Sequence, residues 1–237
     1  MSNGYSQSPK LLKGAIIQFS APLLVPIPNI IVFQYNPETM TRTLTPWAPA
    51  PQSQEVDDPK VVAALAQPFD PEESFSLTLE LDAADALESP ESHPIATIAG
   101  VADRIAALEM LLYPPGDSVL GVLLNSVGSF FGATPVDVLP RKTVPVILFF
   151  WGPGRIVPVR ITNFSVDEQA YSPTLYPIRA KVTLGLRILD ATSFGDDDSA
   201  AVSIAKACYT FTRAQKESLA LANSANSVES ILGMLPI

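Results

Sequence analysis

The stretch of residues 177–189 constrains the fold of this chain more than any other. Its apolar residues recur at every second position: Ile178, Ala180, Val182, Leu184, Leu186 and Ile188. The positions between them are mostly charged or polar, as at Arg179, Lys181 and Arg187. A period of two is typical of a strand with one buried and one exposed face. The sequence therefore predicts a half-buried β-strand here, and with it a sheet.

Two apolar segments come directly before this strand. Residues 144–151 are almost entirely apolar, and residues 155–166 follow after Gly152-Pro153-Gly154. The glycines and the proline between them predict a hairpin turn. In the second segment the apolar parity reverses after Ile161, which predicts a β-bulge near Thr162 or Asn163. Together with residues 177–189, these segments predict an antiparallel meander.

The first half of the chain predicts further strands and a long loop. The strands are expected at residues 11–19, 30–35 and 75–81, and the second of them is apolar on both faces. Residues 41–70 are rich in proline, threonine and glutamine, so they predict a surface loop with one helical turn at 61–66. The neighbouring pair Glu72-Glu73 is expected in a solvated loop.

Two helices and one apolar insertion complete the expected elements. Apolar residues at three-to-four spacing predict an amphipathic helix over residues 94–112, capped by Ser92 or His93. A second helix is expected over residues 200–223, capped within Asp196–Ser199 and followed by an apolar end. The segment 116–142 is apolar and punctuated by glycine and proline, so we expect core filling or a contact with another subunit.

Composition disfavours several classes of function. The net charge of −9 disfavours nucleic acid as a partner, because an acidic surface repels phosphate. The single cysteine forbids an internal disulfide, and the first residues do not form a signal peptide. No apolar run reaches the roughly 20 residues that a membrane span needs. We therefore expect a protein that is cytoplasmic at synthesis.

Candidate chemical groups are few and isolated. His93 stands before a proline, Cys208 has no basic neighbour close in sequence, and Asp196–Asp198 lack the alternate spacing of a calcium loop. We interpret His93 and Asp196–Asp198 as helix caps and Cys208 as a small buried hydrophobic residue. The sequence predicts no catalytic residue, metal or cofactor. Catalytic carboxylates that are distant in sequence leave no local pattern, so a β-rich binding or hydrolytic domain stays open as an alternative.

Several segments together resemble a known family. They are Leu12-Lys-Gly-Ala-Ile-Ile, Val32-Phe-Gln-Tyr-Asn-Pro-Glu-Thr-Met-Thr-Arg42, Phe75-Ser-Leu-Thr-Leu-Glu-Leu-Asp82, Ala107-Leu-Glu-Met-Leu-Leu-Tyr-Pro114, Phe150-Trp-Gly-Pro-Gly, Pro158-Val-Arg-Ile-Thr-Asn-Phe-Ser, Tyr171-Ser-Pro and Pro177-Ile-Arg-Ala-Lys-Val. The chain is similar over residues 11–190 to the tube-like baseplate or hub-adaptor proteins of contractile injection systems, which are phage-tail-like particles. Relatives often continue into a LysM-like module, but the segment after Asp190 is too short to form one.

The resemblance implies a fold and a role in assembly. The expected fold is α+β and mainly β. It has an antiparallel tail-tube-like β-barrel domain at residues 1–190, with the flanking helix 94–112, and a helical extension at residues 191–237. The implied function is structural and not enzymatic: a homo-oligomeric ring, expected to be six-fold, that joins the inner tube to the spike or hub. A tube initiator or a tube-end protein is a variant of this hypothesis.

The implied partners are sister copies, tube and spike or hub subunits, and baseplate wedge or sheath-adaptor proteins. Neither nucleic acid nor a membrane span is expected. The candidate subunit-interface residues are Phe33, Tyr35, Leu120, Leu123, Leu124, Phe130, Phe131, Leu232 and Leu235.

Overall fold

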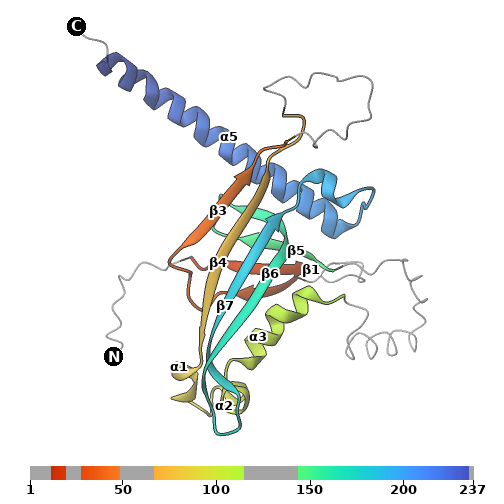
Figure 1. Ribbon diagram of the computed structural model, residues 1–237, viewed down its shortest axis with the longest axis vertical. Helices are drawn as coiled ribbons and strands as arrows, with labels where there is room; N and C mark the ends of the chain where they lie inside the picture. The colour runs from red at the N-terminus through yellow and green to blue at the C-terminus, as the bar shows by residue number, and fades with distance from the viewer. Residues whose placement is uncertain (1–11, 20–27, 49–66, 115–143, 235–237) are drawn as a thin grey trace, which may run out of the picture.

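A seven-stranded antiparallel sheet forms the centre of the molecule, so the fold is α+β and mainly β (Figure 1). The computed structural model describes residues 12–19, 28–48, 67–114 and 144–234. The strands are β1 (Ala15–Phe19), β2 (Pro28–Val32), β3 (Met40–Thr45), β4 (Glu72–Asp82), β5 (Val146–Phe150), β6 (Ile156–Tyr171) and β7 (Pro177–Ile188). Their order across the sheet is β2-β1-β5-β6-β7-β4-β3. The strands β2 and β3 therefore form its two edges.

The predicted meander is confirmed as β5, β6 and β7. Trp151 donates its backbone N–H to the carbonyl of Arg155 over 2.9 Å, which closes the predicted hairpin turn. The register of β6 against β7 shifts between Ile161 and Asn163, as the change of parity predicts. The inward residues of β7 are buried and its charged residues are exposed. Side-chain periodicity thus specified both the strands and the bulge.

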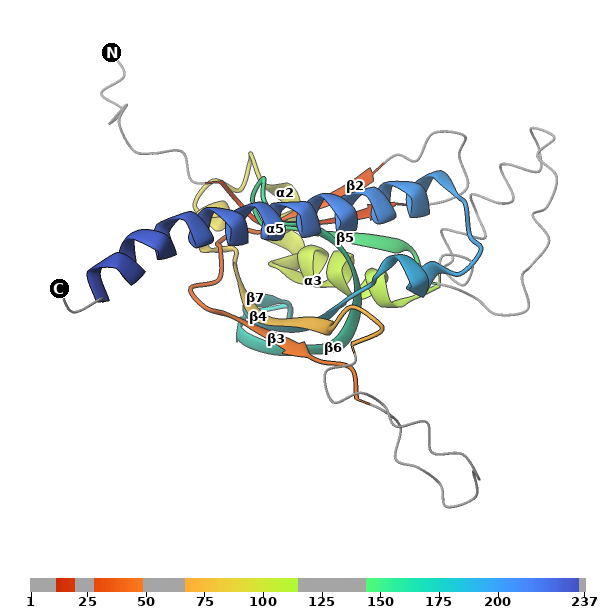
Figure 2. The same ribbon diagram turned by 90° about the horizontal axis from the view of Figure 1, so that it is seen from above.

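The sheet curls strongly about its concave face. In a flat sheet, three strand spacings of about 4.8 Å would separate β5 from β4 by about 14 Å. The rings of Phe75 on β4 and Phe149 on β5 are nevertheless centred only 5.5 Å apart. The helix α3 (Ala102–Glu109) lies within this curve and contributes the buried residues Ile105 and Leu108 to the same core (Figure 2). The concave face is therefore the main hydrophobic core.

The expected closed barrel is wrong, because no backbone ladder joins β2 to β3 in the described part of the chain. A side chain bridges part of the gap instead. Gln34, which follows β2, accepts from the backbone N–H of Asp82 over 3.0 Å and donates to its carbonyl over 2.7 Å. Asp82 ends β4, and β3 pairs with β4 only as far as Leu77. The amide of Gln34 thus satisfies backbone groups of β4 that lie beyond the end of β3.

The predicted helix over residues 94–112 is broken into three pieces: α2 (Pro94–Ala99), α3 and the 3-10 helix η1 (Met110–Leu112). Gly100 causes the break with a φ of 59°, and its backbone lies against the carbonyl of Pro177. Ile95 and Ile98, which belong to the apolar stripe of the predicted helix, are exposed because the break separates their face from that of α3. His93 is the N-cap of α2, but its side chain accepts no hydrogen bond from the backbone N–H groups of the first turn.

Other elements differ from expectation near β3 and β4. Residues 40–45 form β3 where a loop was expected, since a polar edge strand carries little apolar signal. The strand β4 begins at Glu72, so Glu72 and Glu73 belong to the sheet and not to a solvated loop. A short helix, α1 (Ala84–Leu87), follows β4 without a sequence prediction. The helical turn expected at 61–66 lies outside the described residues.

The C-terminal helix α5 (Ala200–Met234) follows the 3-10 helix η2 (Ala191–Phe194). Ser199 accepts from the backbone N–H of Val202, so the cap predicted within Asp196–Ser199 is confirmed at its last residue. The helix is 35 residues long and continues well past the expected end near Asn223. Its first part lies across the sheet, while its second part projects beyond the body of the molecule (Figures 1 and 2). No helix of the described residues is long and apolar enough to cross a membrane.

Candidate functional site

The first part of α5 covers the convex face of the sheet at β1 and β5. Ala205 is fully buried there against Phe19 and Leu148, and Cys208 packs at the edge of the same cluster. Because Ile147 and Phe149 face the main core while Leu148 faces α5, strand β5 is buried on both sides. This accounts for its continuous apolar sequence.

Thr212 attaches α5 to the start of β6. Its hydroxyl accepts from the backbone N–H of Ile156 over 3.1 Å and donates to the carbonyl of Ile156 over 2.8 Å. Only 3% of Thr212 is exposed. One hydroxyl thus satisfies both backbone groups of a strand end, which fixes the position of the helix along β6.

We expect the substitution Thr212→Val to weaken the docking of α5 by about 1–3 kcal/mol, because it leaves two buried backbone groups of Ile156 without partners. Hydrogen exchange of the amides in residues 200–217 measures the effect as faster exchange. Thr210→Val is the matched control, since Thr210 is exposed and bonds only the carbonyl of Lys206 in its own helix. Equal exchange in the two variants would refute the anchoring role of Thr212.

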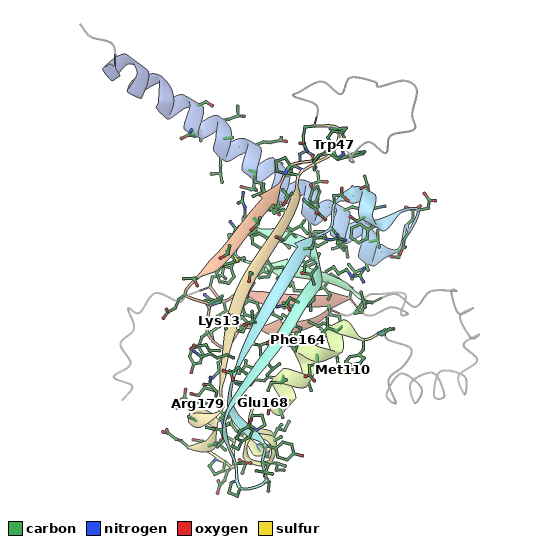
Figure 3. All side chains as sticks on the ribbon, viewed as in Figure 1. Lys13, Trp47, Met110, Phe164, Glu168 and Arg179 are labelled. Carbon is green, nitrogen blue, oxygen red and sulfur yellow. The ribbon has the colours of Figure 1, made fainter. Side chains whose placement is uncertain are left out.

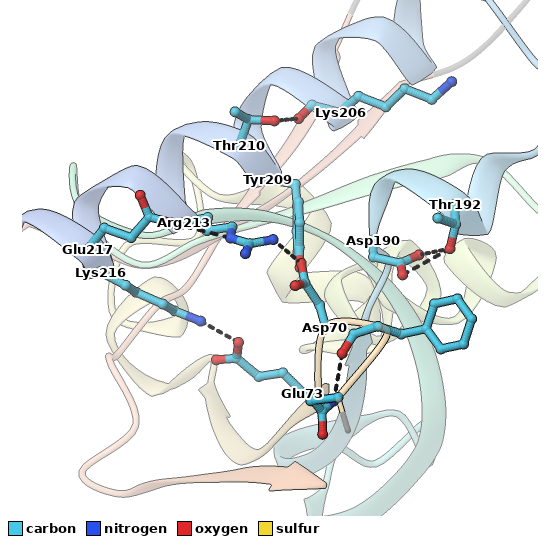
Figure 4. Close-up of polar contacts among 12 residues, drawn as sticks. Asp70, Glu73, Asp190, Thr192, Lys206, Tyr209, Thr210, Arg213, Lys216 and Glu217 are labelled. Carbon is cyan, nitrogen blue, oxygen red and sulfur yellow. Dashed lines mark hydrogen bonds and ion pairs between the residues drawn. The ribbon is translucent and has the colours of Figure 1, made fainter. Parts of the chain in front are cut away.

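A polar cluster ties α5 to the beginning of β4 (Figure 4). Tyr209 donates its phenol to the carboxylate of Asp70 over 2.7 Å, and Arg213 pairs with the same oxygen at 2.5 Å. Burial, followed by the hydrogen bond and charge of Asp70, raises the pKa of Tyr209 well above 10. Tyr209 is therefore a neutral donor at physiological pH, and it is unsuited to act as a base.

Glu73 is the centre of a second, more buried group on the concave side. Its side chain is 8% exposed and pairs with Lys216 of α5 and, at 3.2 Å from Nε to Oε1, with Arg42 of β3. The Oε1 atom accepts no hydrogen bond of good geometry from the described residues. One buried carboxylate thus links the edge strand β3, the strand β4 and the helix α5.

A third cation, Arg155, lies beside this group. Its guanidinium carbon is 5.5 Å from the ring centre of Phe75, which places it over the face of the ring. Burial lowers the pKa of Arg155, the positive charge of Arg42 lowers it further, and Glu73 opposes both. No ion pair joins Arg155 to a carboxylate in the described part of the chain. We call Arg42, Arg155, Lys216 and Glu73 the cation cluster.

A polar pocket of about 190 Å³ lies next to these contacts, and its lining includes Asp70, Glu72, Arg187, Asp190 and Tyr209. Burial alone would raise the pKa of Asp190, but hydrogen bonds from Ser193 and Thr192 outweigh it and lower this pKa. Among the described residues that line the pocket, none is a histidine, cysteine or lysine. The pocket therefore offers charge and hydrogen bonds to a ligand and lacks a strong nucleophile.

The isolated candidate groups of the sequence remain apart. Nδ1 of His93 lies 3.3 Å from the carbonyl of Ser89, and burial raises the pKa of Cys208. No three His, Cys, Asp or Glu residues among those described gather as metal ligands. The sequence prediction missed Glu73 and its partners. The parity of β4, in which Glu73 shares a face with Phe75, was the available signal.

Of the candidate interface residues, one is buried, one is exposed and the others are not described. Phe33 is 2% exposed and lies in the main core of the single chain, and its interface role stays a prediction. Gly14 leaves room for its ring, which packs against Trp151 and Phe149. Tyr35 is 47% exposed, and its interface role stays a prediction. The other candidates are not described: Leu232 has no described side chain, and the residues outside the described ranges are Leu120, Leu123, Leu124, Phe130, Phe131 and Leu235.

Exposed apolar residues occur on an edge strand and at a hairpin tip. On the edge strand β2, Ile30 and Val32 are more than half exposed on the convex side, beyond the cover of α5. At the tip of the β6–β7 hairpin, Leu175 is 79% exposed with a φ of 65°. Figure 3 shows Glu168 and Arg179 near this tip, far from Trp47 at the other end of the molecule. Apolar exposure of this kind is typical of protein contacts.

The described contacts thus bring together charged side chains, exposed apolar residues and two open strand edges. A comparison of the chain with protein-family models and with curated proteins finds no match.

Proposed function

We propose that this protein is a structural subunit of a contractile injection system baseplate, in which a ring of its copies joins the inner tube to the spike or hub. The observation that carries the proposal is the open curled sheet with an exposed apolar edge strand. Ile30 and Val32 of β2 stand 53% and 55% exposed beside backbone groups that no described strand pairs. Open sheet edges favour pairing between chains, and in a ring of identical copies a neighbouring subunit covers the apolar β2 edge.

The resemblance of several segments to tube-like baseplate proteins supports the same assignment. The low charged share of 16% is consistent with surfaces covered by neighbouring subunits. In this proposal the tail-tube-like wall forms only when the ring assembles. The curved open sheet of each copy supplies one segment of that wall.

Native mass spectrometry of the purified protein, alone and with tube and spike subunits, tests the proposal. We expect ring-sized species that also contain these subunits. The substitution Val32→Glu should shift them to monomer, because it places a charge in the apolar contact. Ile98→Glu is the matched control, since Ile98 is also more than half exposed, at 69%, but lies on α2. A wild-type protein that stays monomeric and binds neither subunit would refute the proposal.

A further inference from the structure

The edge strand β3 has backbone groups available for another strand. Both backbone groups of Asp82 bond to Gln34, so they point away from β7. In an antiparallel ladder this direction alternates along the strand. The register of β4 with β3 therefore engages Thr41, Thr43 and Thr45, and it directs the N–H and C=O groups of Met40, Arg42 and Leu44 outward. Figure 1 shows β3 as the outermost strand on its side of the sheet.

The side chains at this edge face the concave side. Met40, Arg42 and Leu44 pair across the ladder with Leu77, Phe75 and Glu73, which are all buried there. Leu44 is nevertheless 43% exposed, because no described residue covers the inner side of β3 at this point. A strand added to β3 would thus lay alternate side chains against Arg42 and Leu44.

The charges around this edge are unbalanced. The cation cluster contains three positive side chains and only one carboxylate, in a protein whose net charge is −9. Arg155 is partly buried, and the carboxylate that acts on it, Glu73, already pairs with Arg42 and Lys216. A partly buried cation that shares one carboxylate with two other cations is incompletely compensated. A second carboxylate on the inner side of an added strand would compensate for it.

The strand β2 of a sister copy does not provide this carboxylate, because its sequence Pro-Asn-Ile-Ile-Val has no acidic residue. A polyanion such as nucleic acid would match the charges, but it cannot pair with the outward backbone groups of Met40 and Leu44. The open strand edge therefore favours a polypeptide, as in other cases of strand addition.

We propose that the β3 edge binds an extended acidic segment of another protein, which adds to the sheet as an eighth strand and places a carboxylate between Arg42 and Arg155. This inference goes beyond the proposed function and does not depend on ring formation, since a single copy carries the complete edge.

Binding of short synthetic peptides to the full chain tests the proposal. The probe has the sequence Lys-Val-Thr-Glu-Thr-Val-Lys with blocked ends, about the length of a short strand, so that valine, glutamate and valine share one face. Isothermal titration should show binding at least about tenfold tighter than that of the same peptide with glutamine in place of glutamate. The difference should shrink as salt is raised.

Two further measurements separate strand addition from simple charge attraction. N-methylation of the backbone amides that would face β3 should abolish binding, because it removes the donors to the ladder. The variant Arg155→Met should lose the preference for glutamate, whereas Arg160→Gln should keep it, since Arg160 is an exposed cation on the convex face of β6. Thermal unfolding verifies that both variants are folded.

Three results would overturn the proposal: no binding of any peptide, equal binding of the glutamate and glutamine peptides, or undiminished binding after N-methylation. Retention of the glutamate preference in Arg155→Met would equally contradict the assigned role of Arg155.

Discussion

The substitution Gly100→Ala is expected to lower the free energy of unfolding by 3 kcal/mol or more, the sum of about 1–3 kcal/mol for backbone strain and a further cost for a backbone clash. Gly100 has a φ of 59° and a ψ of −121°, a conformation that residues with a Cβ rarely adopt. A Cβ at this position would stand 2.1 Å from the carbonyl oxygen of Pro177. The same carbonyl accepts from the N–H of Val101 over 2.9 Å, so it cannot move freely.

Thermal unfolding measures this effect. A loss of 3 kcal/mol corresponds to a fall in Tm of about 6–12 °C for a chain of this size. Gly154→Ala is the matched control, because Gly154 lies in the β5–β6 turn with a negative φ and no atom within 4 Å of a built Cβ. We expect its Tm to change by less than about 2 °C. If both variants unfold at the wild-type temperature, the close packing of α2 on β7 is wrong.

The substitution Glu73→Gln should have the second largest effect, a loss of about 2–3 kcal/mol. It removes the only carboxylate of the cation cluster and leaves Arg42, Arg155 and Lys216 to repel one another. We expect less than the full cost of breaking a buried ion pair, because Arg42 and Lys216 are 37% and 41% exposed and water screens their charges.

Glu72→Gln is a control of the same chemistry at the adjacent position. Glu72 is 64% exposed on the convex face and pairs with Arg187 at 3.0 Å, so its loss should cost less than about 1 kcal/mol. Chemical denaturation by urea at low and at high salt measures both variants. The defect of Glu73→Gln should shrink in high salt, which screens the repulsion between cations. Equal stability of the two variants would mean that Glu73 does not organise the cluster.

The strands of the meander could be predicted from the sequence because each has one buried face. In β7 the alternation from Ile178 to Ile188 reflects contact with the core on one side and water on the other. The edge strand β3 has no such contrast, since most of its side chains are exposed. The break at Gly100 was missed because a glycine inside a helical pattern is tolerated, and only the contact with Pro177 shows why the helix ends there.

The cation cluster could not be predicted, because its members come from β3, β4, the β5–β6 turn and α5. Glu73 and Lys216 lie 143 residues apart in the chain, and no local spacing connects them. The same holds for closure of the sheet. Alternation specifies which face of a strand is buried, but it does not determine whether the two end strands meet.

The order of strands in the sheet has a consequence for how the chain reaches its native state. Among the described strands, only β6 lies between its two neighbours in sequence, β5 and β7, so we expect this meander to form first. The strand β4 joins it later by closing a loop of 105 residues between Thr78 and Thr183. Refolding should therefore take milliseconds to seconds, and during that interval the unpaired side of β7 is exposed to misassociation with other nascent chains.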